Sequence, residues 1–396
     1  MKETGATDFV VLLKDEIVSK FGRPIKTSRD CHLLSQDIYE RVAEPISANT
    51  LRRLFGLVRT QFQSSGNTVN ILCRYCGFMS IEELVAHRQR RDGNDDANPD
   101  GEAMLYYLIS LFREVPTGSY DNETFIHLVK STHIFLQQYP NMRSSFQQAV
   151  AKTKNGQDYY FEQFVDIDAL NSFYGDGLRY YLLEKRDSAA QIFGYGLLCL
   201  KAWLIERDDL LLRYYARLQQ HQVTADTHPF IAARYFSARL FHALSTGSDV
   251  QPVLADAAAF HSSITPSDEH YKQFPGFEFL FAQALLFTGF PGEALHYIQH
   301  GNTHYTSRPV PFDEGYDQAL VLIEACCLAF SGNVERAVEV YPSLKPTKFY
   351  MLRQKLDGIL YLQLEKHLNI DSSDQEQRLQ QLIAETGFTR LLKLRG

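Results

Sequence analysis

Residues 33–57, LLSQDIYERVAEPISANTLRRLFGL, have the pattern of two short helices joined by a turn. In the first half, apolar side chains recur every four residues and so line one face of a helix: Leu34, Ile38 and Val42. Pro45 ends this helix, because proline has no amide hydrogen and its ring clashes with the preceding turn. Ser47 is a helix-capping residue type, and we expect it to begin a second helix from Ala48 to about Phe55.

The sequence on either side of this pair is also helical in pattern. Its signals are an apolar stripe at residues 9–21, a capping box at Thr27 and Asp30, apolar spacing at 67–76, and a second capping box at Ser80 and Glu83 before a helix over 81–88. No strand pattern interrupts them. We therefore expect residues 1–88 to form a compact all-α domain of five short helices.

Residues 89–101, QRRDGNDDANPDG, contain no large apolar side chain and predict an exposed linker. Charge changes across this stretch. Residues 1–92 carry 14 Lys and Arg against 11 Asp and Glu, a balance of +3, whereas residues 93–396 carry 26 against 36, a balance of −10. A basic head on an acidic body is typical of a protein whose head alone meets a polyanion.

The body, residues 102–396, is predicted to be helical and partly repetitive. Four residues recur at a spacing of 43: Ala282, Leu285, Gly289 and Ala294 reappear as Ala325, Leu328, Gly332 and Ala337. Small residues allow two antiparallel helices to approach, and glycine makes the turn between them. This unit resembles the helix hairpin of tetratricopeptide repeats, although their usual period is about 34 residues. The resemblance implies an α-solenoid, with residues 192–219 and 229–260 as earlier units.

The head also resembles a known group. Its helix–turn–helix resembles the lambda-repressor-like fold, and more closely an N-terminal module of Bacteroidota proteins with the pattern Ile-Ser-x-x-Thr-Leu-x-Arg-Leu-x-Gly, then Thr-Leu-x-x-Leu-x-x-Tyr-x-Gly-Phe. The matching residues are Ile46, Ser47, Thr50, Leu51, Arg53, Leu54 and Gly56, then Thr68, Leu72, Tyr75, Gly77 and Phe78. Val69 replaces the second Leu. The match covers about 60 of 396 residues and implies a DNA-binding-like fold.

In a helix-turn-helix, the second helix enters the major groove and its first residues reach the base edges. The residues expected to meet DNA are Ser47, Ala48, Asn49, Thr50, Arg52 and Arg53 on that helix, with Lys26, Ser28 and Arg59 as phosphate contacts in the flanking loops. Asn pairs with adenine and Arg with guanine through two hydrogen bonds each. The alternative is that the two arginines are a solvated helix face. The turn, residues 43–46, departs from the usual pattern because it lacks Gly and contains Glu44.

These features favour a DNA-binding transcription regulator whose body dimerises, senses a peptide or protein ligand, or does both. The domain order resembles that of peptide-responsive regulators of Gram-positive bacteria. The alternative is a non-enzymatic scaffold whose head serves protein contact. The expected partners are duplex DNA, read in its major groove, and a second copy of the chain.

Other patterns argue against enzyme, metal and cofactor functions. Cys73 and Cys76 have metal-ligand spacing but no second Cys pair, and they share a helix face suited to core packing. His296, His300 and His304 are four apart, but Gly301 and Asn302 should end the helix before the third. The glycine pairs at 175–177 and 194–196 lack the rest of a phosphate-binding loop, and no nucleophile elbow, HExxH or kinase motif occurs.

The remaining composition predicts a cytoplasmic protein. No run of about 18 apolar residues could span a membrane, and the first residues do not form a secretory signal. Six scattered cysteines are expected to be reduced and buried. Adjacent aromatic pairs at 159–160, 180–181, 214–215 and 235–236 predict one core residue and one residue at the edge of the buried face in each pair.

Overall fold

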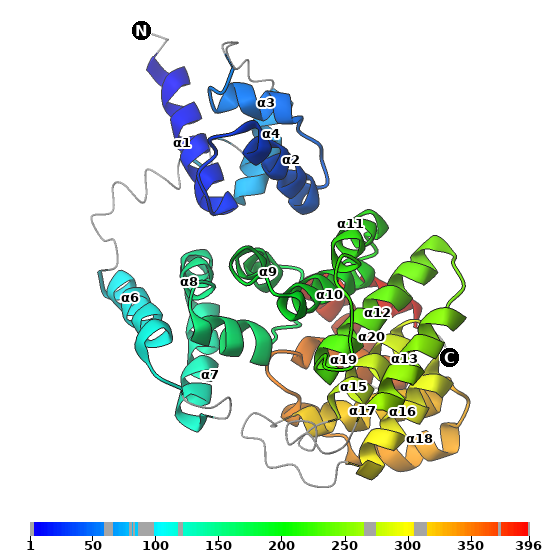
Figure 1. Ribbon diagram of the computed structural model, residues 1–396. Coiled ribbons are helices and arrows are strands. Elements are labelled where there is room, and N and C mark those ends of the chain that lie inside the picture. The colour runs from blue at the N-terminus through cyan, green and yellow to red at the C-terminus, as the bar shows by residue number, and fades with distance from the viewer. Residues whose placement is uncertain are drawn as a thin grey trace. The chain divides into compact units, whose positions relative to one another are not determined.

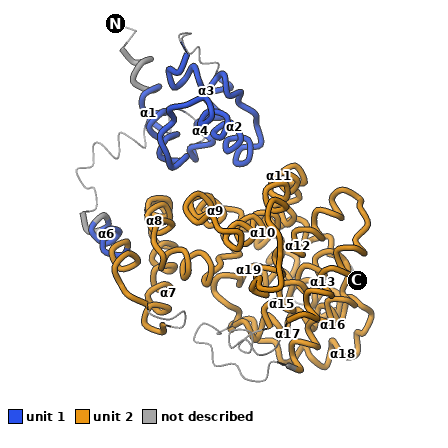
Figure 2. The backbone as a smooth tube through the Cα atoms, in the orientation of Figure 1, with its two compact units in different colours: residues 1–108 blue, residues 109–396 orange. Residues whose placement is uncertain are grey.

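The computed structural model describes residues 4–58, 66–78, 81, 84–85, 99–117, 122–264, 275–304, 315–370 and 374–394. Every regular element in these ranges is a helix, which confirms the all-α class (Figure 1). The chain divides into two compact units, residues 1–108 and 109–396 (Figure 2). None of the helices in the described ranges combines the length and the apolarity needed to cross a bilayer.

The head contains four helices with complete bounds: α1 (Thr4–Phe21), α2 (Ser28–Val42), α3 (Ala48–Leu54) and α4 (Gly66–Cys76). Two predicted caps are present. The Thr27 side chain accepts from the Asp30 amide while Asp30 accepts from the Thr27 amide, and Ser47 accepts from the Thr50 amide at 3.1 Å. The predicted fifth helix, 81–88, is described only at residues 81, 84 and 85, which are helical.

Helix α2 packs against α3 and α4, and α1 packs against α4. The core between them is built from fully buried apolar residues: Leu13, Ile17, Leu34, Ile38, Leu51, Leu54 and Leu72. A buried polar cluster adjoins it. The Asp37 carboxylate of α2 accepts from the Tyr75 hydroxyl of α4 and from Arg41 Nε at 3.2 Å. The hydrogen bond between Tyr75 and Asp37 fixes how α4 packs on α2, because a buried polar group that lost its hydrogen-bond partner would destabilise the fold.

The turn between α2 and α3 places an alanine where glycine is usual. Ala43 has φ 62° and ψ 14°, in the left-handed region, and its amide donates to Tyr39 O at 2.9 Å. A side chain in that region costs roughly 1 kcal/mol or more. The chain makes this turn without glycine and carries the strain.

Replacing Ala43 with Gly should stabilise the head by about 1 kcal/mol, because the side chain is exposed and its strain is relieved. The matched control is Ala48→Gly at the start of α3, where the backbone is right-handed and glycine should cost about 0.5–1 kcal/mol. Urea unfolding followed by circular dichroism measures both. Changes of the same sign in the two variants would contradict the turn geometry.

The first body helix starts earlier than expected. Helix α6 (Pro99–Glu114) begins inside the predicted linker 89–101, so the linker prediction placed its end three residues too late. Proline is well tolerated in the first turn of a helix, since the amide it lacks has no partner there. Residues 89–98 lie outside the described ranges, and the boundary between the two compact units lies within α6.

The described residues between 109 and 187 pack around an aromatic core. The elements are α7 (Glu123–Gln138), η1 (Pro140–Met142), α8 (Arg143–Val150), the π-helix η2 (Gly156–Gln163) and α9 (Phe173–Glu184). Both residues of the pairs 159–160 and 180–181 are buried, whereas 214–215 and 235–236 each have one buried and one half-buried residue. The edge-and-core prediction was therefore wrong for the first two pairs. In each of these two pairs, the π-helix and the helices around it cover both aromatic rings.

Helix hairpins form the rest of the body. Their helices are α10 (Ser188–Leu204), α11 (Asp208–Leu218), α12 (Pro229–Thr246), α13 (Gln251–Ser263), α15 (Gly276–Phe287), α16 (Pro291–His304), α17 (Tyr316–Phe330), α18 (Val334–Val340), α19 (Gln354–His367) and α20 (Gln375–Thr386). The first helix of each hairpin packs on the first helix of the next hairpin: α10 on α12, α12 on α15, α15 on α17, and α17 on α19. Two short 3₁₀ turns, η3 (Tyr341–Ser343) and η4 (Pro346–Lys348), connect α18 to α19.

The turns of these hairpins share one geometry. In the described ranges, five residues between paired helices have positive φ: Glu206, Gly247, Gly289, Gly332 and Asn369. The amide after each donates to a carbonyl five residues earlier, at 2.8–2.9 Å. The two glycines of the 43-residue repeat, Gly289 and Gly332, thus make the turns that the repeat predicted. Glu206 and Asn369 make the same turn without glycine.

The end of the chain returns to the first hairpin. Segment η5 (Thr389–Lys393) packs on α10 and on α19. Arg390 Cζ lies 3.8 Å from the centroid of the Trp203 ring, and Arg390 Nε donates to Trp203 O at 2.7 Å. In an open array of repeats each unit contacts only its neighbours. Here the C-terminal segment joins the first and last hairpins.

Two carboxyl groups lie before α9: that of Asp166 is buried and that of Asp168 is half-buried. The Asp168 carboxylate accepts from the Lys355 and Leu356 amides at 2.8 and 3.0 Å and so caps α19 from a distant part of the chain. Asp166 accepts from the Ala169 amide at 3.0 Å. Burial raises the pKa of Asp166 to about 7 and that of Asp168 to about 6.

This burial predicts a pH-dependent stability. A carboxyl that holds its proton more tightly when folded favours folding below its unfolded pKa of about 4, and this contribution is lost as pH rises through about 7. Asp166→Asn keeps the acceptor for Ala169 but has no charge, so its unfolding free energy should fall less steeply between pH 4 and 8. The difference should be on the order of a few kcal/mol. Urea titrations at several pH values test this, with exposed Asp226→Asn as control, and parallel curves for Asp166→Asn and the parent chain would contradict it.

Candidate nucleic-acid interface and ligand pocket

Helix α3 has one buried and one exposed face. Leu51 and Leu54 are buried against the head core, with at most 1% of their surface exposed. Asn49 and Arg53 are exposed on the other face. The Ser47 cap and the two leucines thus hold a short helix in place and present an amide and a guanidinium outward.

The other residues predicted on this helix have structural roles. Ala48 is half-buried and packs against the core. The Ser47 and Thr50 hydroxyls are 2.9 Å apart and hydrogen-bond to each other. Of the six residues predicted to read bases, Asn49 and Arg53 are the ones with long polar side chains that the structure leaves exposed.

Arg52 lies between the two faces. It is half-buried, and its Nη1 donates to Asn49 Oδ1 at 3.2 Å. Its Nε is buried and has no hydrogen-bond partner among the described residues. Arg52 therefore orients Asn49 and is not simply a solvated arginine, the alternative left open by the sequence.

The structure describes two of the three residues predicted to contact phosphate. Lys26 and Ser28 are exposed at the start of α2. The Lys26 and Thr27 amides both donate to Asp30 Oδ2, at 3.1 and 2.9 Å. Because these amides already have a partner, a phosphate at this end would be met by the Lys26 and Ser28 side chains. Arg59 lies outside the described residues.

Glu44, the acidic residue in the turn between α2 and α3, forms an ion pair within the head. Glu44 Oε1 pairs with Arg74 Nη1 of α4 at 2.7 Å. The Ser35 hydroxyl of α2 donates to Ile46 O at 2.5 Å and holds the turn on the helix. The carboxylate that departs from the usual turn pattern is therefore not an isolated negative charge beside α3.

The cysteines follow the packing prediction. None of the six forms a disulfide, and all except Cys76, which is half-buried, are buried. Burial raises the pKa of the Cys76 thiol well above its ordinary value, so the thiolate that would bind a metal is disfavoured. The Cys73-x-x-Cys76 spacing is explained by core packing on one face of α4.

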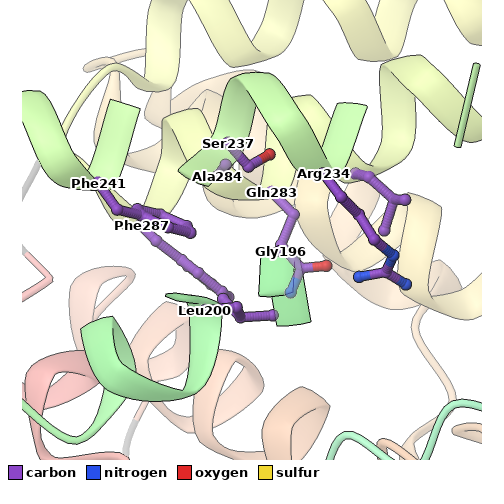
Figure 3. Close-up of a pocket in the computed structure, with 9 residues that line it drawn as sticks. Gly196, Leu200, Arg234, Ser237, Phe241, Gln283, Ala284 and Phe287 are labelled. Atoms are coloured by element: carbon purple, nitrogen blue, oxygen red, sulfur yellow. The ribbon is translucent and has the colours of Figure 1, made fainter. Parts of the chain in front are cut away.

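The body has a pocket between α10, α12 and α15. Its lining is Gly196, Leu200, Arg234, Ser237, Phe241, Leu280, Gln283, Ala284 and Phe287. Figure 3 shows Phe241 and Phe287 at one end and Arg234 at the other. Gly196 allows the close crossing of α10 and α12, because a Cβ there would lie 3.0 Å from Arg234 Cβ. This explains one of the glycines that did not belong to a phosphate-binding loop.

Arg234 is a buried cation with little compensation. It is 9% exposed, and its Nε has no hydrogen-bond partner in the described part of the chain. Its Cζ lies 5.3 Å from the centroid of Phe193. The nearby Arg353 is paired with Asp357 through two nitrogens at 2.7–3.0 Å, so that acid is already used. Burial lowers the pKa of Arg234 to about 10, which marks a charge held away from water.

No protein-family model, curated protein or solved structure matches this chain.

Proposed function

We propose that this chain is a DNA-binding transcription regulator, with a helix-turn-helix head that reads the major groove and a tetratricopeptide-like body that binds a ligand. The observation that carries the proposal is the two-faced α3, anchored by Leu51 and Leu54 and presenting Asn49 and Arg53. These are the side-chain types that bond adenine and guanine edges through two hydrogen bonds.

The size of α3 is compatible with this role. An α-helix with its side chains is about 10–12 Å across and the major groove is about 12 Å wide, and the seven residues of α3 extend about 10 Å along the helix axis. So short a helix meets few bases. A homodimer formed through the body would present two heads to half-sites about 34–36 Å apart, as other helix-turn-helix dimers do.

The charge distribution also favours DNA contact by the head and not by the body. The head segment, residues 1–92, has a balance of +3, and the rest of the chain has −10. The acidic body would be repelled by phosphates and so leaves DNA contact to the head.

The body is proposed to be a compact array of tetratricopeptide-like hairpins. Five turns of one geometry and the serial packing of α10, α12, α15, α17 and α19 support this. The pocket at Arg234 is proposed as its ligand site. The enclosed space is about 20 Å³, which is room for one small group, so it suits a single small anion such as a carboxylate placed against the Arg234 guanidinium.

The DNA-binding proposal predicts a selective loss in Arg53→Ala. Selection of random duplexes on the full-length protein should enrich one sequence. Arg53→Ala should weaken binding to it by roughly 10- to 100-fold and relax one base position. Lys26→Ala should weaken all duplexes about equally and reduce the dependence on salt.

The matched control is Lys152→Ala, which removes an exposed charge from the body and should bind like the parent chain. Failure of the parent chain to enrich any sequence would overturn the proposal. Capture of a protein partner that depends on Arg53, without salt-dependent DNA affinity, would instead favour the scaffold alternative.

The ligand proposal predicts that Arg234→Met is at least as stable as the parent chain without ligand, because it removes an uncompensated buried charge. It should also lose the rise in melting temperature that small carboxylates such as formate and acetate give the parent chain. Arg239→Met, one turn along α12 and paired with Asp256 at 2.8 Å, should keep that rise. A strongly destabilised Arg234→Met, or equal ligand responses in both variants, would contradict the assignment.

A further inference from the structure

Three potential metal ligands from three helices meet in the body. His261 on α13, Glu278 on α15 and His300 on α16 place one ligand atom each within 4.8 Å of one another. His261 Nε2 lies 2.9 Å and His300 Nδ1 3.2 Å from Glu278 Oε1. The cluster belongs entirely to the second compact unit and is separate from the pocket at Arg234.

These distances fit a transition metal held by nitrogen and oxygen. Zinc binds imidazole and carboxylate at about 2.0–2.2 Å, so neighbouring ligand atoms of a tetrahedral ion lie about 3.3 Å apart. The two N–O distances, 2.9 and 3.2 Å, are close to that edge, and the three ligand atoms, which lie within 4.8 Å of one another, would draw to about that spacing around a bound ion. Two imidazoles and one carboxylate also leave one position of such an ion for water or another ligand.

The surroundings hold the ligands in place. Glu278 is fully buried, and the His261 side chain is 11% exposed. The His261 ring stacks on Phe277 at 5.4 Å and meets the edge of Tyr297 at 5.1 Å. His300 is 37% exposed, so one ligand reaches the surface and gives an ion a way in.

A glycine brings the third ligand close. A Cβ at Gly301 would lie 3.0 Å from Pro275 Cβ and 3.5 Å from Glu278 Cβ, so glycine allows α16 to approach the start of α15. The expectation that Gly301 and Asn302 end the helix was wrong, because α16 continues to His304. The sequence grouped His300 with His296 and His304, whereas its ligand-distance neighbours are His261 and Glu278.

We propose that His261, Glu278 and His300 form a binding site for a divalent first-row transition metal, with zinc as the probe. A bound ion would replace hydrogen bonds between imidazole and carboxylate with coordination bonds and would join α13, α15 and α16. The proposal does not depend on DNA binding. The competing explanation is that the three side chains are only a hydrogen-bonded contact between helices.

The test uses the full-length chain, stripped with a chelator and titrated with zinc by calorimetry, and with cobalt by visible absorption. The parent chain should bind one ion per chain, and zinc should raise its melting temperature. Glu278→Gln retains the shape and hydrogen bonding of the side chain, and His300→Ala changes a partly exposed ring. Each of these two substitutions should weaken zinc binding by roughly 10- to 100-fold or more, because even residues that only hydrogen-bond to a metal ligand contribute that much to metal affinity.

His296→Ala is the matched control, because His296 is exposed one turn earlier on α16 and lies outside the cluster. It should bind zinc like the parent chain. The proposal is overturned if the parent chain binds no zinc, or if His296→Ala loses as much affinity as His300→Ala. It is also overturned if all variants bind alike. Should Glu278→Gln fail to fold, His300→Ala with its control decides the question.

Discussion

A single backbone interaction recurs throughout this molecule: the hydrogen bond that closes a helix at a left-handed residue. In the body, the amide that follows Gly247, Gly289 or Gly332 donates to a carbonyl five residues earlier. The head uses the same bond after Gly56 and Gly77. It satisfies carbonyls that a helix end would leave unpaired, and it reverses the chain over a few residues. The stacking of α10, α12, α15, α17 and α19 depends on these reversals, because each returns the chain so that the next hairpin can pack on the last.

Such turns explain which parts of the fold the sequence could predict. Glycine at Gly289 and Gly332 was visible as a repeat because glycine is the residue that adopts positive φ without strain. Ala43, Glu206 and Asn369 adopt the same backbone without that signal, so their turns could not be recognised from residue type. Helix caps at Thr27 and Ser47 were predictable, since a cap involves residues three apart. The capping of α19 by Asp168 and the stacking of Arg390 on Trp203 join residues about 187 apart, and no local pattern carries that information.

The same distinction applies to the sites. The sequence located α3 and its polar residues correctly, but it could not say that Ala48 would pack inward or that Arg52 would be half-buried and hold Asn49. The exposure of each polar side chain depends on how α3 is rotated about its own axis against α2. The buried contacts of Leu51 and Leu54 set that rotation. The cluster of His261, Glu278 and His300 was missed for a stronger reason. Its members come from three helices, and their proximity depends on how closely α16 approaches α15.

Segment η5 ties the first hairpin of the body to the last. Open arrays of helix hairpins bind extended peptides along a continuous surface. In this chain Arg390 of η5 donates to Trp203 O at the end of α10, and Lys393 pairs with Glu206 in the turn that follows, so the first hairpin is tied to the last and less free to open. The buried guanidinium of Arg234 lies beside the small pocket between α10, α12 and α15, within this tied set of hairpins. A small anion that paired with Arg234 would stabilise the packing of these three helices, and the hairpins stacked on them would share that stabilisation.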